Sequence, residues 1–143
     1  MAVGLTGGTV YTFKVYAINA VGQSYPPAQS NSITATTYPS APSNVNASIG
    51  VLSTSANISW TAPFDGGTPI TSYTITSIPG NITTTSTTTS GTITGLTGGT
   101  VYTFTVVATN AAGNSPNSSA SNSITAITVP TAPSNVNASI GVS

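Results

Sequence analysis

The chain has 143 residues, no His, no Cys and a formal net charge of zero, because Lys14 and Asp65 carry its only charges. General acid–base catalysis, an activated hydroxyl nucleophile and a metal site need His, Cys or clustered carboxylates, so the composition predicts no catalytic, cofactor or metal residues. A single lysine excludes nucleic acid and anionic lipid as partners, and no apolar run is long enough to span a bilayer, so we expect no membrane insertion.

Two blocks of the sequence occur twice at one fixed distance. Residues 5–13 recur letter for letter as 96–104, and residues 41–51 recur as 132–142, a period of 91 in both cases (96 − 5 and 132 − 41). A constant period indicates a tandem array of one module. We therefore expect three parts: the last two strands of one module (1–37), a complete module (38–128), and the first strand of a following module (129–143).

Short alternating runs of apolar, β-branched and aromatic residues predict strands along the complete module, and no stretch has a helical period. In chain order, the expected strands are at residues 45–49, 56–60, 70–75 and 83–89, then a segment at 93–96 that leads to a glycine corner, then strands at 102–108 and 124–126. The threonine-rich run at 83–89 suits a sheet edge. Seven short strands with regular turns predict an all-β, two-sheet sandwich.

The segment that precedes the complete module, residues 37–42, contains two prolines and returns with both prolines as residues 128–133. Closely spaced prolines favour an extended backbone. This pattern predicts a semi-stiff connection that spaces successive modules along a rod.

Four motifs resemble the fibronectin type III family when they are taken together and in order. They are Trp60 on the second strand, Tyr73 after Pro69-Ile70, Leu-Thr-Gly-Gly-Thr-Val-Tyr at 96–102, and Ala-Thr-Asn-Ala-Ala-Gly-Asn-Ser at 108–115. The resemblance covers the full repeat and both fragments, and it implies an immunoglobulin-like seven-stranded β-sandwich. Gly98 departs from the family, which usually has Pro there, and this predicts a slightly looser corner. No Arg-Gly-Asp triplet occurs, so the integrin-binding role of some family members does not carry over.

Five residues are expected to form the structural core: Trp60, Tyr73, Leu96, Tyr102 and Phe104. Trp60 as an exposed platform for stacking on sugar is the alternative, but its alternation along the second strand favours the core. The resemblance implies a tyrosine corner, in which the Tyr102 hydroxyl bonds to the backbone near Leu96.

Five Asn-X-Ser/Thr triplets are candidate glycosylation acceptors: Asn46, Asn57, Asn81, Asn117 and Asn137. Strand phase and loop position predict that they are reachable. A chain this rich in Asn, Ser and Thr also forms such triplets by chance, so an unmodified surface is the alternative, as is O-linked sugar on residues 83–90.

Asp65 is expected to support the glycine turn that follows it through a side chain-to-backbone hydrogen bond, with a share in a calcium clamp between modules as the alternative. The loops at 63–68 and 111–120 lack an Arg or aromatic anchor and make weak ligand sites. The inward face of residues 1–37 has no partner sheet in this chain. Because an isolated hairpin is marginal in water, we expect this segment to be frayed or completed by another copy.

These features predict a non-catalytic structural spacer of a secreted or cell-surface multi-repeat protein of bacterial or phage type, whose partners are neighbouring modules of the array. Residues 1–4 do not form a signal peptide, so we expect a secretion signal outside this sequence. One alternative is an adhesive module that binds polysaccharide or a cell-surface protein weakly at many repeats. Such a module would need exposed aromatics in register, but Tyr16 and Tyr25 become Val107 and Pro116 one repeat later. An accessory module of a polysaccharide-degrading enzyme is the other alternative.

Overall fold

The computed structural model describes residues 2–52 and 54–141, and all its regular elements in that range are strands. The complete module contains β5 (Ser43–Ile49), β6 (Ala56–Thr61), β7 (Ile70–Ile78), β8 (Thr83–Ser86), β9 (Ser90–Ile93), β10 (Val101–Asn110), β11 (Gly113–Asn114) and β12 (Ile124–Thr125). The preceding segment contains β1 (Val10–Tyr11), β2 (Lys14–Val15), β3 (Ala28–Gln29) and β4 (Ile33–Thr34). Within the described ranges no helix has the length and hydropathy needed to cross a bilayer.

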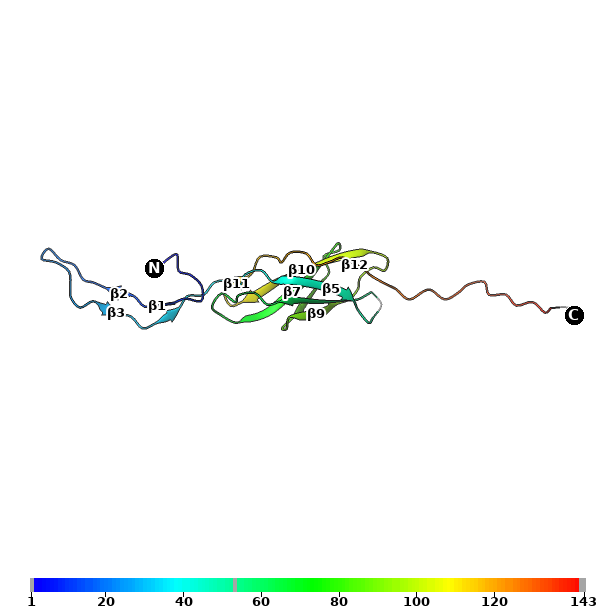
Figure 1. Cartoon of the computed structure of the whole chain (residues 1–143), viewed down its shortest axis with the longest axis horizontal. Coiled ribbons are helices and arrows are strands. Elements are labelled where there is room, and N and C mark those ends of the chain that lie inside the picture. The colour runs from blue at the N-terminus through cyan, green and yellow to red at the C-terminus, as the bar shows by residue number, and fades with distance from the viewer. Residues whose placement is uncertain (1, 53, 142–143) are drawn as a thin grey trace.

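Two antiparallel sheets pack face to face in the complete module (Figure 1). One has the strand order β5-β6-β9, and the other has the order β11-β10-β7-β8, with β12 also paired to β10. The long pair β7 and β10 runs in register from Thr103 opposite Ile78 to Thr109 opposite Ser72, where a register shift occurs. This arrangement confirms the predicted all-β sandwich.

The core lies between the sheets because apolar residues alternate with polar ones along the strands. Along β6 every second residue is buried, and along β10 the buried residues run from Tyr102 to Ala108 in steps of two. A strand turns successive side chains to opposite faces, so this period places one set inside and leaves a polar set outside. Ile49, the last residue of β5, stands in phase with the buried Ala47 but has 46% of its surface exposed.

The sequence predicted one strand over the threonine-rich residues 83–89, and this prediction is wrong. Residues 87–89 of the run lie between two strands. β8 ends at Ser86 and pairs only with β7, which places it at a sheet edge, whereas β9 begins at Ser90 and pairs with β6 in the other sheet. The Ser86 hydroxyl donates to the carbonyl of Ser90 at 2.6 Å and accepts from the backbone N–H of Thr88 at 3.1 Å, which closes the crossover. A run of threonine and serine carries no alternation of apolar and polar residues, so it cannot mark where the chain changes sheets.

Three buried serines join the last segment of the module to β10. Backbone N–H groups of β10 donate to the hydroxyl oxygens of Ser115, Ser118 and Ser121 at 2.9–3.0 Å, and each hydroxyl donates in turn to a nearby carbonyl. The backbone N–H of each serine donates back to a β10 carbonyl. The serines recur every third residue while their partners on β10 recur every second, so this segment pairs closely without regular strand register.

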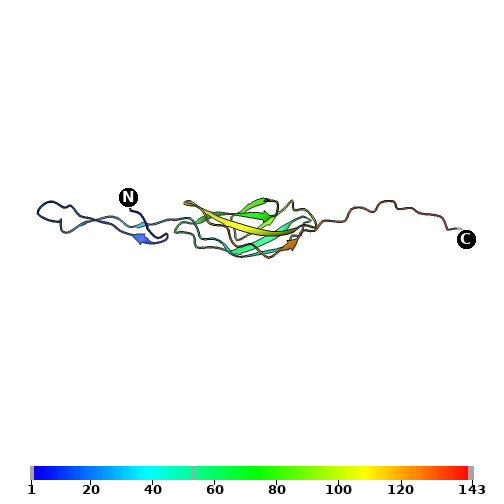
Figure 2. The same ribbon diagram turned by 90° about the horizontal axis from the view of Figure 1, so that it is seen from above.

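The two ends of the chain lie on opposite sides of the module, in line with it (Figure 2). Residues 2–37 form an open hairpin in which β1 pairs with β4 and β2 with β3. Val15 is 67% exposed there, whereas its repeat equivalent Val106 is fully buried, because no second sheet covers the hairpin among the described residues. Residues 129–141 are exposed and contain no strand. Their counterparts in β5 pair with β6, and no equivalent of β6 follows in the described chain.

Candidate functional site

The five predicted core residues all lie inside the sandwich. Trp60, Tyr73, Leu96, Tyr102 and Phe104 have at most 6% of their surface exposed. Trp60 packs edge-on against Tyr73 with ring centroids 5.2 Å apart, so its ring faces the core and is not a platform for sugar. Its Nε1 is buried and has no hydrogen-bond partner among the residues that the structure describes.

Tyr102 bridges the corner that precedes β10. The backbone N–H of Thr97 donates to the Tyr102 hydroxyl at 3.0 Å, next to Leu96 as the resemblance implied. That hydrogen bond stabilises the phenolate and lowers the pKa of Tyr102 below its ordinary value. Tyr11 accepts the same bond from Thr6 at 3.0 Å in the open hairpin, so the corner forms there without a second sheet.

The candidate glycosylation acceptors lie at the surface: Asn46, Asn57, Asn81, Asn117 and Asn137 are all exposed. The side-chain oxygen of Asn57 accepts a hydrogen bond from the Thr92 hydroxyl at 2.8 Å. Both residues line a shallow hollow over β6 and β9 whose other members are Ser48, Ile58, Ser59, Ser90 and Gly91. Glycosylation stays a prediction, and the hollow offers uncharged hydrogen-bonding groups without an aromatic ring.

Asp65 supports the turn that follows it, because its carboxylate accepts a hydrogen bond from the backbone N–H of Gly67 at 2.9 Å. Gly66 and Gly67 both have positive φ angles, of 76° and 87°, which glycine adopts without strain. No group of three or more His, Cys, Asp or Glu side chains gathers in the described part of the chain.

Asn110 joins three segments at the end of the module that faces the hairpin. Its Nδ2 donates to the carbonyls of Thr37 at 2.8 Å and Asp65 at 2.7 Å, and its Oδ1 accepts from the backbone N–H groups of Ala112 and Gly113. The role of Asn110 was not predicted from the sequence. Its signal is the pattern Asn-x-x-Gly, which occurs at the same place in both repeats, since Asn19 precedes Gly22 as Asn110 precedes Gly113.

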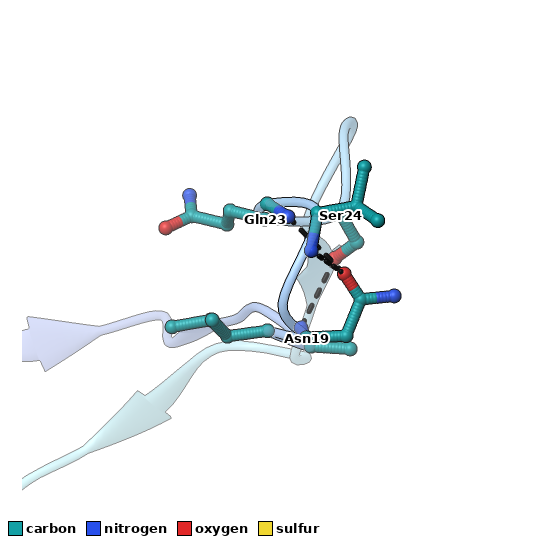
Figure 3. Close-up of a pocket in the computed structure, with 7 residues that line it drawn as sticks. Asn19, Gln23 and Ser24 are labelled. Atoms are coloured by element: carbon teal, nitrogen blue, oxygen red, sulfur yellow. Dashed lines mark hydrogen bonds between the residues drawn. The ribbon is translucent and has the colours of Figure 1, made fainter.

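Asn19, the repeat equivalent of Asn110, lies in the matching turn at the free end of the hairpin (Figure 3). No preceding segment covers this turn in the described part of the chain. The hollow there is lined by Ala17, Ile18, Asn19, Val21, Gly22, Gln23 and Ser24. Asn19 Oδ1 accepts from the backbone N–H groups of Val21 and Gly22, and its Nδ2 points away from the turn. At the complete module the equivalent Nδ2 holds the incoming connection and the loop that follows β6. The hollow at Asn19 therefore lies where, in the complete module, the equivalent turn is covered by the incoming connection.

The loop at 63–68, which the sequence offered as a weak ligand site, lies against the preceding segment. Backbone N–H groups of Thr37 and Ser40 donate to the carbonyls of Gly66 at 2.9 Å and Phe64 at 3.0 Å. The junction between the hairpin and the module is thus a polar site, held by backbone hydrogen bonds and by the Asn110 side chain.

Comparison with known proteins gives a consistent result. The model of the fibronectin type III domain matches residues 40–124. Chitinase A1 of Niallia circulans is 40% identical over 96% of this chain, and the chain spans a fifth of that protein's length. A structure of domains A168–A170 from titin matches 71% of the chain and 37% of its own length, with 28% identity and a TM-score of 0.59. Titin kinase with its flanking domains matches 63% of the chain and 17% of its own, with 31% identity and a TM-score of 0.56.

Proposed function

Because the chain belongs to the fibronectin type III family, we propose that it is a non-catalytic structural spacer of a secreted or cell-surface multi-repeat protein. The observation that carries the proposal is the continuity of the complete module with its neighbour. The connection at residues 37–40 is hydrogen-bonded to the module's own loop, so the module is built as a link in a series. The hollow on its surface over β6 and β9 is shallow and lined by uncharged residues, unlike the deep clefts with convergent polar groups that bind small molecules.

The likeness to a chitinase supports one setting for this spacer. A chain that is similar to a fifth of a larger polysaccharide-degrading protein fits the role of an accessory module, which holds other domains of the same protein apart. The uncharged surface fits a location outside the cell, where hydroxyl and amide groups keep the protein hydrated without charge repulsion. In this setting the module has no reaction of its own.

An adhesive module is the second candidate, and the hollow over β6 and β9 is the observation that favours it. Its amide and hydroxyl groups are suited to hydrogen-bonding a sugar. Asn57 and Thr92 already bond to each other there, however, and weak polar contacts without an aromatic anchor give little affinity.

A sedimentation experiment with insoluble chitin and cellulose separates the two functions. The spacer predicts that the full chain stays in the supernatant at low and high salt. Retention that soluble oligosaccharide competes away, and that Asn57→Ala abolishes, would overturn the spacer and establish the adhesive module. Asn46→Ala, at another exposed strand position outside the hollow, is the matched control.

A further inference from the structure

The hairpin meets the complete module where four glycines lie together, two from each side. Gly7 and Gly8 form the corner of the hairpin, and Gly66 and Gly67 form the turn of the module's loop. A Cβ on Gly67 would lie 2.5 Å from the backbone nitrogen of Gly8, and a Cβ on Gly66 would overlap the carbonyl oxygen of Thr37. The two backbones come this close only because neither loop carries a side chain at the contact.

The connection across this contact is fixed by hydrogen bonds. Thr37 donates its N–H to the carbonyl of Gly66 at 2.9 Å and accepts from Asn110 Nδ2 at 2.8 Å, so both of its backbone groups are bonded to the module. Three residues later Ser40 exchanges two bonds with Phe64, at 3.0 and 3.2 Å. The sequence predicted a semi-stiff proline linker, but this connection is bonded to the module that follows it.

The glycine corner that the hairpin contributes to this contact, Gly7 and Gly8, recurs at the far end of the complete module as Gly98 and Gly99. Gly99 repeats Gly8 with nearly the same φ, 79° against 77°, and donates to the carbonyl of Ala126 at 2.8 Å as Gly8 donates to that of Ala35. A Cβ on Gly8 would lie 2.8 Å from the ring of Phe64, whereas a Cβ on Gly99 would meet nothing within 4 Å. The backbone at Gly99 therefore has the same conformation as the backbone at Gly8, but no loop packs against it among the described residues.

We propose that this glycine corner is a docking surface for the Asp-Gly-Gly loop of the next module, and that the contact holds successive modules in one fixed orientation. The proposal rests on the spacer function and adds how the spacer is built. Its partner is a further repeat of this sequence, and its recognition element is the loop equivalent to Asp65–Gly67. Among the described residues, the hydrogen bonds that join the hairpin to the module use the backbone groups of Thr37, so the fit depends on close backbone approach and not on charge.

The contact already present in the full chain allows a direct test by pulsed electron–electron distance measurement. The chain has no Cys, so spin labels attach only at introduced positions. Thr34→Cys on β4 and Thr85→Cys on β8 replace exposed residues on the two sides of the junction. A fixed orientation predicts one narrow distance distribution. A broad distribution in the otherwise unchanged chain would overturn the proposal.

Gly67→Ala tests the backbone approach itself. The added methyl group would collide with Gly8, so we expect the narrow peak to be lost. Gly95→Ala is the matched control, because Gly95 also has a positive φ of 79° but has open space where its Cβ would stand, so its peak is expected to stay narrow. A narrow peak in both variants, or a broad one in both, would overturn the proposal.

Asn110→Asp keeps the proposal testable if Gly67→Ala does not fold. The carboxylate retains the acceptor for the turn and loses the donor to Thr37, so the peak is expected to broaden. Asn19→Asp makes the same change at the uncovered turn and should leave the peak unchanged. Equal behaviour of these two variants would contradict the assigned contact.

Hydrogen exchange gives an independent readout in the same chain. The Thr37 amide, bonded to Gly66, should exchange much more slowly than the amide of Thr128, its repeat equivalent on the exposed side, and Asn110→Asp should remove the difference. Equal exchange of the two amides in the unchanged chain would overturn the contact. If the chain binds chitin and still gives a narrow distance peak, the spacer role would be overturned, whereas the fixed contact between the hairpin and the module would be supported.

Discussion

Replacing Ser118 with alanine should destabilise the module far more than its small volume suggests. The Ser118 hydroxyl accepts from the backbone N–H of Val106 at 2.9 Å and donates to the carbonyl of Ser119 at 2.8 Å. Val106 is fully buried, so its N–H has no access to water once the hydroxyl is gone. An unpaired buried donor costs about 1–3 kcal/mol. We expect a loss near the middle of that range, about 2 kcal/mol, because the exposed Ser119 carbonyl can turn to water.

Urea unfolding followed by the fluorescence of Trp60, the only tryptophan, measures this loss. The midpoint should fall with an unchanged slope, and the melting temperature should fall by about 8–16 °C for a domain of this size. Ser119→Ala is the matched control, because its side chain is exposed, and it should stay within about 0.5 kcal/mol of the parent. Equal midpoints for the two variants would refute the reasoning, since they would mean that another group satisfies the Val106 amide.

Three further predictions concern other parts of the chain. The Asn122 side chain bonds both the N–H and the carbonyl of Ala47 on β5, in the other sheet, so Asn122→Ala should lower the free energy of unfolding in urea by about 1–3 kcal/mol. Asn31→Ala, at the equivalent position one repeat earlier, should be nearly neutral. A larger loss for Asn31→Ala than for Asn122→Ala would contradict this pairing. Burial raises the pKa of Tyr73 above its ordinary value of 10, so the stability that its neutral phenol contributes is present below pH 10 and lost as the pH rises further. Tyr73→Phe should flatten that alkaline loss in unfolding curves taken at increasing pH, and an unchanged slope would show that Tyr73 is not its source. Amides at 9–18 should exchange much faster than the matching amides at 100–109, because the same sequence lacks a covering sheet in the hairpin, and equal protection in dilute monomer would mean that the hairpin is completed.

The sandwich and its core were predictable because alternation is a direct consequence of strand geometry. Trp60, Tyr102 and Phe104 each stand in phase with apolar neighbours, and the structure buries all three. The end of β8 and the start of β9 were not predictable in this way, because threonine suits both faces of an edge strand and gives no signal where the chain leaves a sheet.

The residues that connect segments were harder to recognise because their types usually indicate surface. Ser115, Ser118 and Ser121 are read as polar loop residues, yet all three are buried and bonded to β10. Their regular spacing of three residues was the available signal. Asn110 was hidden for the same reason, since an asparagine in a turn is common and only the structure shows which carbonyls its amide reaches.

The glycine pairs at the junction explain how an uncharged repeat can hold successive modules at a fixed angle. With one cation and one anion in the whole sequence, the repeats have too few charged residues to set the angle between modules by ion pairing. A pair of glycines on each side of the junction provides an alternative, because backbones that touch leave no room for the rotation that long side chains would allow. Hydrogen bonds between uncharged groups are only weakly screened by salt, so the angle should be the same at low and high ionic strength. A side chain at position 98, where the family usually has Pro, would meet the side chain of Thr128, so glycine at this corner lets the connection lie close against it.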